Sequence, residues 1–243
     1  MLNRFLKKAL PVFMIFSLMT CPIPVHAYVD QDSVSQITSQ AEDSDVSASD
    51  STEQTTMEKE PVTVNVSLKA SAFKKMSTKK FIQALGPIAQ ADAKKSGVLA
   101  SVTMAQAILE SGWGKSQLAQ KANNLFGMKT SLSGNTWKGS SWDKKSKYKK
   151  RTAEYGKGNH KYYITASFRK YPTVANSIND HSAYLTGAKN GKSYRYKGLT
   201  KTTSYKKQLT IIRKGGYATS KTYVNDLCKI IRKYKLYEWD KTN

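Results

Sequence analysis

One stretch decides the fold: Met104-Ala-Gln-Ala-Ile-Leu-Glu110-Ser-Gly-Trp113-Gly114. Its first part is apolar and helical in pattern, and the glycines that follow Glu110 end the helix. A single carboxylate therefore stands at the end of an apolar helix, three residues before an indole. Burial against an apolar wall raises the pKa of a carboxyl group, so that it stays protonated near neutral pH and acts as a general acid. This chemistry suits cleavage of a glycosidic bond, which usually requires a second carboxylate as well.

Helical patterns lie on both sides of a short β region. The expected helices cover 79–95 (restarting at Pro87), 98–109, 116–121, 174–185, 205–214 and 222–234. Between them, residues 151–155 and 160–169 flank a Gly-Lys-Gly-Asn turn, which is a good hairpin signal. This order predicts an α+β domain, mainly helical, whose antiparallel hairpin forms one wall of a cleft.

The first 27 residues have the pattern of a secretory signal peptide. Three cations precede an apolar run over 9–19, and Val25-His-Ala27 is a typical cleavage site. The apolar run is too short to span a bilayer comfortably, so we expect cleavage near Ala27 and no membrane span in the mature form. Lipoprotein processing at Cys21 is the alternative, although threonine is a poor residue directly before such a cysteine.

Charge divides the rest of the chain into two parts. Residues 28–60 hold nine acidic residues against one lysine, whereas 61–243 hold 36 basic and eight acidic residues, a net charge of +28. The first part has no apolar period and cannot bury enough surface to offset its chain entropy. We therefore expect a disordered acidic linker over 28–75 and a catalytic domain over 76–241.

Cysteine usage limits the possible chemistry. Cleavage at Ala27 leaves Cys228 as the only cysteine, which excludes an internal disulfide. Cys228 lies in a segment whose apolar residues recur at helical spacing, so we interpret it as a buried small side chain. Neither a metal cluster nor a cysteine protease has the residues it needs, and we expect no metal and no cofactor.

The basic domain has few carboxylates that can partner Glu110. Glu154 is the best candidate, because the hairpin carries it over the cleft beside Arg151 and Tyr155. The alternative for Glu154 is a solvated strand residue paired with a lysine. We expect surface roles for Asp92, Glu238 and Asp240, and structural ion pairs for Asp180 and Asp226.

The motifs taken together resemble the glucosaminidase domain of glycoside hydrolase family 73. The similarity begins with the stretch around Glu110 and covers nearly the whole domain, from about 76 to 240. The further matching segments follow in the family's order: Asn123-Asn-Leu-Phe-Gly127-Met-Lys129, Thr152-Ala-Glu154-Tyr155, Phe168-Arg169-Lys-Tyr171, Ser177-Ile-Asn-Asp180-His-Ser-Ala-Tyr184-Leu and Gly216-Tyr217-Ala-Thr219.

The resemblance implies a lysozyme-like fold, with a helical lobe and a hairpin lobe around a glycan groove. It also implies hydrolysis of the β-1,4 bond after N-acetylglucosamine in peptidoglycan. The implied catalytic residues are Glu110 as general acid, Glu154 as base or stabiliser, and Tyr217 near the reacting sugar. Ser220-Lys221 stands where the family commonly has Asp-Pro, which affects the turn after Tyr217.

Four further residues are candidates for binding the glycan. The resemblance places Asn124 and Phe126 at the floor of the groove. Trp113 and Tyr155 are expected to contact the sugar, and only Trp113 has support from its position. The other aromatic residues considered for stacking on sugar faces are Trp137, Trp142 and Tyr162.

The charge and the signal peptide indicate where the protein acts. A strongly cationic surface favours binding to anionic wall polymers, and export argues against a nucleic-acid target. We expect a secreted, wall-associated monomer. The alternatives are a muramidase or lytic transglycosylase on a related fold, and a non-catalytic cationic wall-binding protein. The sequence leaves open whether the reaction is inverting or assisted by the 2-acetamido group of the substrate.

Overall fold

The computed structural model describes residues 64–132, 137–155 and 161–241, with the backbone alone for 152–155 and Lys161. The expected signal peptide and residues 28–63 of the expected linker lie outside the described residues. Among the residues described, no helix combines the length and the apolar character that crossing a membrane requires.

The expected α+β class is confirmed, with six α-helices and two small antiparallel sheets of two strands each in the described part. The helices are α1 (Thr78–Ser96), α2 (Ala100–Ser111), α3 (Gln117–Ala122), α4 (Val174–Gly187), α5 (Tyr205–Lys214) and α6 (Tyr223–Lys233). The 3-10 helices are η1 (Ala70–Lys75), η3 (Leu199–Lys201) and η4 (Leu236–Asp240). The strands are β1 (Lys147–Tyr155), β2 (Lys161–Arg169), β3 (Lys189–Asn190) and β4 (Ser193–Tyr194).

The folded part begins before the expected boundary at residue 76. Ala70 and Phe73, both in η1, are completely buried, and Leu68 just before them is 9% exposed. The ring of Phe73 packs against Phe81 of α1, with the ring centroids 4.6 Å apart. The sequence does not reveal that η1 contributes to the core, because a short 3-10 helix contains too few apolar residues to show a period.

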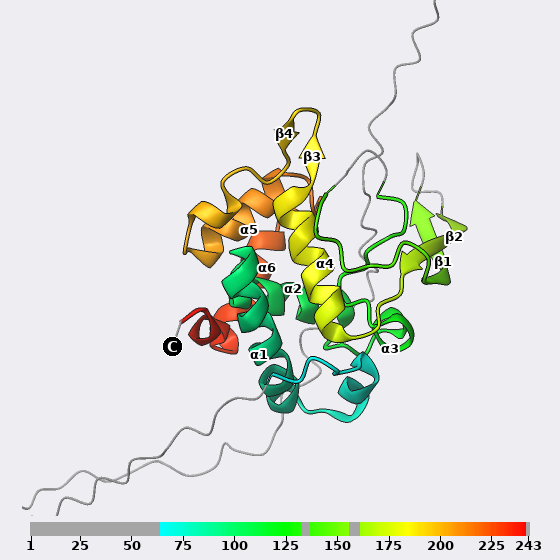
Figure 1. Cartoon of the computed structure of the whole chain (residues 1–243), viewed down its shortest axis with the longest axis horizontal. Helices are drawn as coiled ribbons and strands as arrows, with labels where there is room; N and C mark the ends of the chain where they lie inside the picture. The colour runs from blue at the N-terminus through cyan, green and yellow to red at the C-terminus, as the bar shows by residue number, and fades with distance from the viewer. Residues whose placement is uncertain (1–63, 133–136, 156–160, 242–243) are drawn as a thin grey trace, which may run out of the picture. The chain divides into compact units, whose positions relative to one another are not determined.

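Helix α2 forms the centre of the helical lobe (Figure 1). Its residues from Ala100 to Ile108 are all buried, and it contacts α1, α5, α6 and η4. The carboxylate of Asp240 accepts hydrogen bonds from the backbone N–H and the hydroxyl of Ser101, at 2.8 and 2.6 Å. The expected surface role of Asp240 is therefore wrong, because this carboxylate satisfies a donor at the start of α2.

Asp92 also differs from its expected surface role. It lies on α1 and is 6% exposed, and its Oδ2 accepts from Ser182 of α4 at 2.6 Å and from Ser96 at 3.1 Å. Burial raises the pKa of Asp92, and the two hydroxyl donors oppose that shift. Asp92 therefore joins α1 to α4 inside the protein. Asp226 lies in the first turn of α6, and the described residues provide no ion pair for it.

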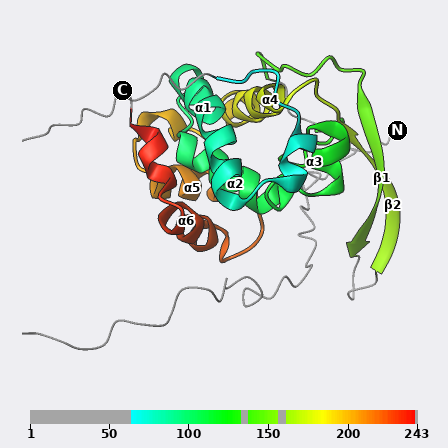
Figure 2. The same cartoon turned by 90° about the horizontal axis from the view of Figure 1, so that it is seen from below.

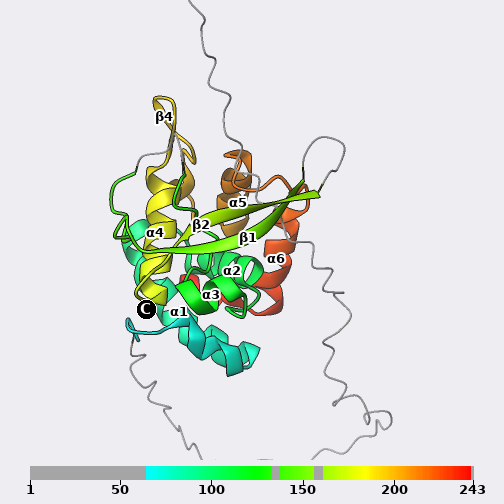
Figure 3. The ribbon, with the colours of Figure 1, turned by 90° about the vertical axis from the view of Figure 1, so that its right-hand side faces the viewer.

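The hairpin β1–β2 packs on the helical lobe through one of its faces. Figure 2 shows it alongside α3, and in Figure 3 the two strands run across the helices. Phe168 and Ala166 lie on this face and form a buried cluster with Leu118 and Ala122 of α3. Exposure on the same face of β2 rises towards the turn, from 7% at Phe168 to 50% at Tyr162. The hairpin is therefore buried at its base and open to solvent near its turn.

Candidate active site

Glu110 ends the central helix, as the sequence predicts. It is the penultimate residue of α2, and Gly112 follows in the left-handed conformation with φ 56°. Burial raises the pKa of the Glu110 carboxyl to about 7, and a hydrogen bond with the Tyr223 hydroxyl opposes that rise. A carboxyl with such a pKa is mostly protonated below neutral pH and about half protonated at pH 7, which suits a general acid.

The hydrogen-bonded aromatic partner of Glu110 is Tyr223, which no motif in the sequence marks as a site residue. Tyr223 is the first residue of α6 and is 2% exposed. Its hydroxyl accepts a hydrogen bond from Nε2 of Gln106, one turn before Glu110 on α2, at 2.9 Å. The sequence signal for Tyr223 is weak, because its apolar neighbours at helical spacing suggest only a core position.

Tyr217 is a buried tyrosine whose pKa is influenced by the Glu110 charge. The ring of Tyr217 is 1% exposed, and its centroid lies 6.1 Å from that of Tyr223. The pKa of Tyr217 is raised well above its ordinary value, first by burial and then by the Tyr223 and Glu110 charges. The fold therefore brings Tyr217 next to Tyr223, the hydrogen-bond partner of Glu110.

The turn after Tyr217 keeps its hydrogen bonds despite the departure from the family pattern. The hydroxyl of Ser220 lies 3.2 Å from the backbone N–H of Thr222 and accepts from it. The carbonyl of Ser220 accepts from Nε of Arg213 at 2.9 Å. Serine therefore supplies a side-chain acceptor just before α6, where the family commonly has aspartate.

Phe126 and Asn124 support the site from inside the protein. Phe126 is completely buried and stacks on His181, with the ring centroids 3.9 Å apart and the planes 9° from parallel. Asn124 is 1% exposed; its amide donates to the carbonyls of Met128 and Arg169 and accepts from the Met128 N–H. We therefore assign Asn124 and Phe126 to shaping the site rather than to direct contact with the glycan.

Trp113 stands at the end of α2 in a cluster of rings. It adopts φ 61°, and its indole meets Phe81 and Tyr234 edge-on, at centroid distances of 5.5 and 4.9 Å. The ring is partly buried in the core. These contacts join the end of α2 to α1 and to the end of α6, and they hold the segment that carries Glu110.

Glu154 and Tyr155 lie near the end of β1, and their side chains lie outside the described part. The register pairs Glu154 with Tyr162 and Tyr155 with Lys161. Tyr162, the partner of Glu154 on β2, is 50% exposed, so this end of the hairpin is open to solvent.

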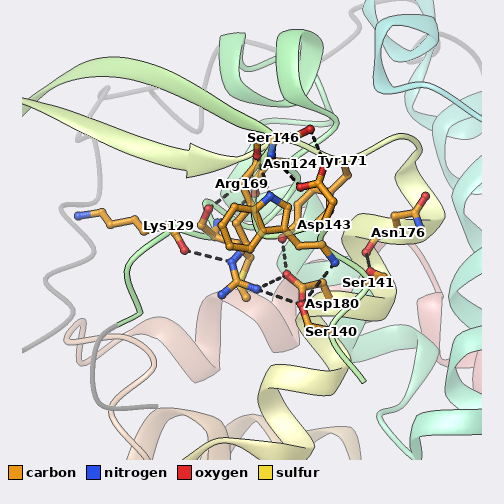
Figure 4. A network of polar contacts seen from close by, with 12 residues as sticks. Asn124, Lys129, Ser140, Ser141, Asp143, Ser146, Arg169, Tyr171, Asn176 and Asp180 are labelled. Atoms are coloured by element: carbon orange, nitrogen blue, oxygen red, sulfur yellow. Dashed lines mark hydrogen bonds and ion pairs between the residues drawn. The ribbon is translucent and has the colours of Figure 1, made fainter. Parts of the chain in front are cut away.

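A buried ion pair anchors the base of the hairpin (Figure 4). Nη1 of Arg169, the last residue of β2, lies 2.7 Å from Oδ2 of Asp180 on α4. Asp180 also accepts from the hydroxyls of Tyr171 and Ser140, each at 2.6 Å. The expected structural ion pair of Asp180 is confirmed.

Two of the tryptophans considered for sugar stacking belong to this anchor. The guanidinium carbon of Arg169 lies 4.5 Å from the ring centre of Trp137 and 4.7 Å from that of Trp142. Such cation–π contacts stabilise a buried guanidinium. Trp137 and Trp142 therefore hold the hairpin base, whereas Tyr162 remains half exposed.

The described residues include no group of three or more histidine, cysteine or acidic side chains arranged to hold a metal ion. Cys228 is 4% exposed and unpaired, and burial raises the pKa of its thiol. The interpretation of Cys228 as a buried small side chain is confirmed.

Known proteins resemble this chain over the part just described. A family model described as mannosyl-glycoprotein endo-beta-N-acetylglucosaminidase, or glucosaminidase, matches residues 86–236. Exo-glucosaminidase LytG of Bacillus subtilis is 39% identical over 163 residues, which are 67% of this chain and 54% of LytG. Peptidoglycan hydrolase FlgJ of Pseudomonas aeruginosa is 34% identical over 167 residues, or 67% of this chain and 38% of FlgJ. The chain thus spans about half or less of these curated relatives.

A solved structure agrees with the fold. The catalytic domain of the autolysin Auto from Listeria monocytogenes superposes with a TM-score of 0.58 and 32% sequence identity. The match covers 70% of this chain and 92% of that domain.

Proposed function

The chain belongs to the glucosaminidase family, and we propose that it is a secreted peptidoglycan hydrolase that cleaves the β-1,4 bond after N-acetylglucosamine. The observation that carries this proposal is the Glu110 carboxyl, whose pKa is raised to about 7 at the end of α2. The names of LytG, FlgJ and Auto support the wall glycan as the substrate. We also propose that residues 1–27 are a secretory signal peptide and that the acidic segment after them is a linker.

Glu110 is the proposed general acid. Its protonated carboxyl gives a proton to the bridging oxygen of the glycosidic bond while the bond from C1 to that oxygen breaks. The carboxylate that remains is held by the Tyr223 hydroxyl, which Gln106 positions from the preceding turn of α2. Water then supplies the hydroxyl group at C1. In the substrate-assisted route its proton goes directly to Glu110, whereas in the inverting route it goes to Glu154 and exchange with solvent reprotonates Glu110.

Glu154 is the proposed second carboxylate. In an inverting reaction it takes a proton from the attacking water, and in a substrate-assisted reaction it stabilises charge while the 2-acetamido oxygen attacks C1. Its place on β1, opposite Tyr162 near the solvent-open end of the hairpin, supports either role. Among the proposed glycan contacts, we place Trp113 and Tyr155 beside the groove and Tyr217 at the reacting sugar.

The basic surface is the proposed means of holding the enzyme on the wall. Exposed cations follow one another on α5, α6 and β1: Lys206, Lys207, Lys214, Lys229, Arg232, Lys233, Lys147, Lys149 and Arg151. Surface charge of one sign attracts a polyanion over long range, and this attraction weakens with salt. The proposed partners are therefore anionic wall polymers, and their binding should weaken with rising salt concentration.

Digestion of purified peptidoglycan tests the activity. The full chain and its Glu110→Gln variant are incubated with the glycan, and reduced products are identified by mass spectrometry. Fragments ending in reduced N-acetylglucosamine, absent with the variant, support both the reaction and the acid. Their sizes separate internal cleavage from release of terminal units.

Other products contradict the proposal in distinct ways. Reduced muramic acid at the new end indicates a muramidase, and an anhydro-sugar indicates a lytic transglycosylase. No fragments from wild-type protein that still binds the wall indicate a non-catalytic wall-binding protein. Circular dichroism of both proteins verifies that the variant is folded.

A further inference from the structure

His181 occupies a buried position behind Tyr217. It lies on α4, is fully buried, and places its Nε2 3.0 Å from the hydroxyl oxygen of Tyr217. The ring of Phe126 stacks on the imidazole of His181 with nearly parallel planes. The ring of Tyr217 meets the same imidazole edge-on, at 87°. Two aromatic rings therefore fix the plane of the imidazole and aim one nitrogen at one hydroxyl.

The tautomer of His181 follows from which of its two ring nitrogens has a hydrogen-bond partner. Its Nδ1 is buried and has no hydrogen-bond partner among the described residues. Burial lowers the pKa of His181 to about 3, so the ring is neutral in the working range and carries one N–H. A buried N–H without an acceptor is rarer and less tolerated than a bare acceptor. The proton therefore belongs on Nε2, where Tyr217 accepts it.

Gln106 shows the same arrangement on the other tyrosine of the site. Its Nε2 donates to the Tyr223 hydroxyl at 2.9 Å, and its buried Oε1 has no hydrogen-bond partner among the described residues. His181 and Gln106 thus each donate a hydrogen bond to a tyrosine oxygen, and each has a buried acceptor atom (Nδ1 and Oε1) without a hydrogen-bond partner among the described residues. A tyrosine oxygen that accepts such a bond has its own proton left to donate in another direction.

Tyr223 is hydrogen-bonded to Glu110, and the ring of Tyr217 lies beside that of Tyr223, with the centroids 6.1 Å apart. Burial raises the pKa of both tyrosines, and the Glu110 charge adds to the shift of each. We propose that His181 and Gln106 are positioning residues that turn the hydroxyl protons of Tyr217 and Tyr223 towards Glu110. The two hydroxyls then act as preset donors to the carboxylate that forms when Glu110 gives up its proton. Preset donors stabilise developing charge without a cost of reorganisation during the reaction.

A spectroscopic measurement tests the tautomer without any substrate. The full chain is labelled with ¹⁵N on histidine, and the ring signals of His181 are identified by their loss in a His181→Gln variant. We expect Nε2 to be protonated and Nδ1 to be bare at neutral pH. A proton on Nδ1, or on both nitrogens, overturns the proposal whatever reaction the protein catalyses.

Turnover tests the positioning role, and this part rests on the proposed glycan hydrolysis. His181→Phe keeps a ring against Phe126 but removes the donor, and it should lower kcat by roughly tenfold, the effect of losing one hydrogen bond in a charged network. His181→Gln restores an N–H donor and should recover most of that loss. Equal losses in both variants contradict the role of the donor.

A double variant separates positioning from general disruption. If His181 acts through Tyr217, the combined His181→Phe and Tyr217→Phe variant should be no slower than Tyr217→Phe alone. Losses that multiply overturn the proposal. Ser182→Ala is the matched control: it removes a buried hydrogen bond to Asp92 from the next residue of α4 and should leave kcat unchanged. If His181→Phe does not fold, the tautomer measured in the wild-type chain decides whether His181 donates to Tyr217.

The two proposals fail in different ways. Absence of glycan fragments from the wild-type chain removes the reaction but leaves the tautomer measurement valid. Normal fragments together with a proton on Nδ1 leave the hydrolase proposal standing and remove the donor role of His181.

Discussion

Nη1 of Arg169 lies 2.7 Å from Oδ2 of Asp180, and the two side chains are 6% and 0% exposed. The pair joins the last residue of β2 to the middle of α4, and thereby ties the base of the hairpin to the helical lobe. The strand from Arg169 to Tyr162 spans roughly 23 Å at about 3.3 Å per residue. A tilt of the base is therefore amplified at the end of the hairpin that carries Glu154.

Asp180→Ala should destabilise the protein by about 3–5 kcal/mol, because it leaves the Arg169 guanidinium buried without its carboxylate. Denaturant unfolding measures this change. Asp143→Ala is the control, since Asp143 is an exposed carboxylate in the neighbouring loop, and its effect should be much smaller. Equal losses in the two variants contradict the assignment of Arg169 and Asp180 as the anchor.

Glu110→Gln should stabilise the protein at high pH. Folding raises the pKa of Glu110 from 4.5 to about 7, so the folded state binds the proton more tightly than the unfolded chain. The contribution of this group to stability is complete below pH 4.5 and is lost as the pH rises through 7. Above pH 7 the wild-type protein carries a penalty of about 3 kcal/mol that glutamine lacks. Unfolding at pH 4 and pH 8 measures it, and a pH-independent difference between the two proteins contradicts the shift.

The rate of glycan hydrolysis should fall as the pH rises above about 7, because the proposed acid Glu110 then loses its proton. Tyr223→Phe removes the hydrogen bond that lowers the pKa of Glu110, so the alkaline limb of the kcat profile should move to higher pH. Tyr237→Phe, at an exposed position of η4, is the control and should leave the limb in place. An unmoved limb in Tyr223→Phe excludes Tyr223 as the partner of the acid.

Tyr217→Phe should lower turnover more than glycan binding, since we place its hydroxyl at the reacting centre beside Glu110. The variant keeps the buried ring and removes only the oxygen that contacts His181. Kinetics on soluble glycan fragments separate kcat from KM. Unchanged kcat removes Tyr217 from the site.

Gly114→Ala should destabilise the segment that carries Glu110. Gly114 has φ 70°, and an added Cβ would lie 2.4 Å from Cδ2 of Phe73. The change combines left-handed strain with a core clash and should cost more than about 2 kcal/mol. Gly112→Ala is the matched control, because φ is 56° there and no atom lies within 4 Å, so strain alone remains. Equal unfolding free energies for the two variants contradict the clash with Phe73.

The local signals in the sequence were sufficient for most of the fold. Ser77, Ser116 and Ser204 each precede a helix and accept a hydrogen bond from its first turn, as capping residues do. The hairpin register follows from a strong turn signal between two β-like runs. Two elements were not predicted, because they are too short to show a period of apolar residues. They are η1, with its buried Phe73, and the β3–β4 pair, whose strands have two residues each.

The sequence by itself determined that Glu110 ends an apolar helix, because helix periodicity and the glycine stop are properties of neighbouring residues. Only the tertiary structure decided what surrounds that carboxyl. Tyr223 became its hydrogen-bonded partner, His181 came to contact Tyr217, and Trp137 and Trp142 enclosed Arg169. The residues in each of these contacts come from separate elements, and local pattern carries no information on which ring will meet which polar group. Packing of the helices around α2 makes that choice, since most buried polar groups must find a hydrogen-bond partner inside the core.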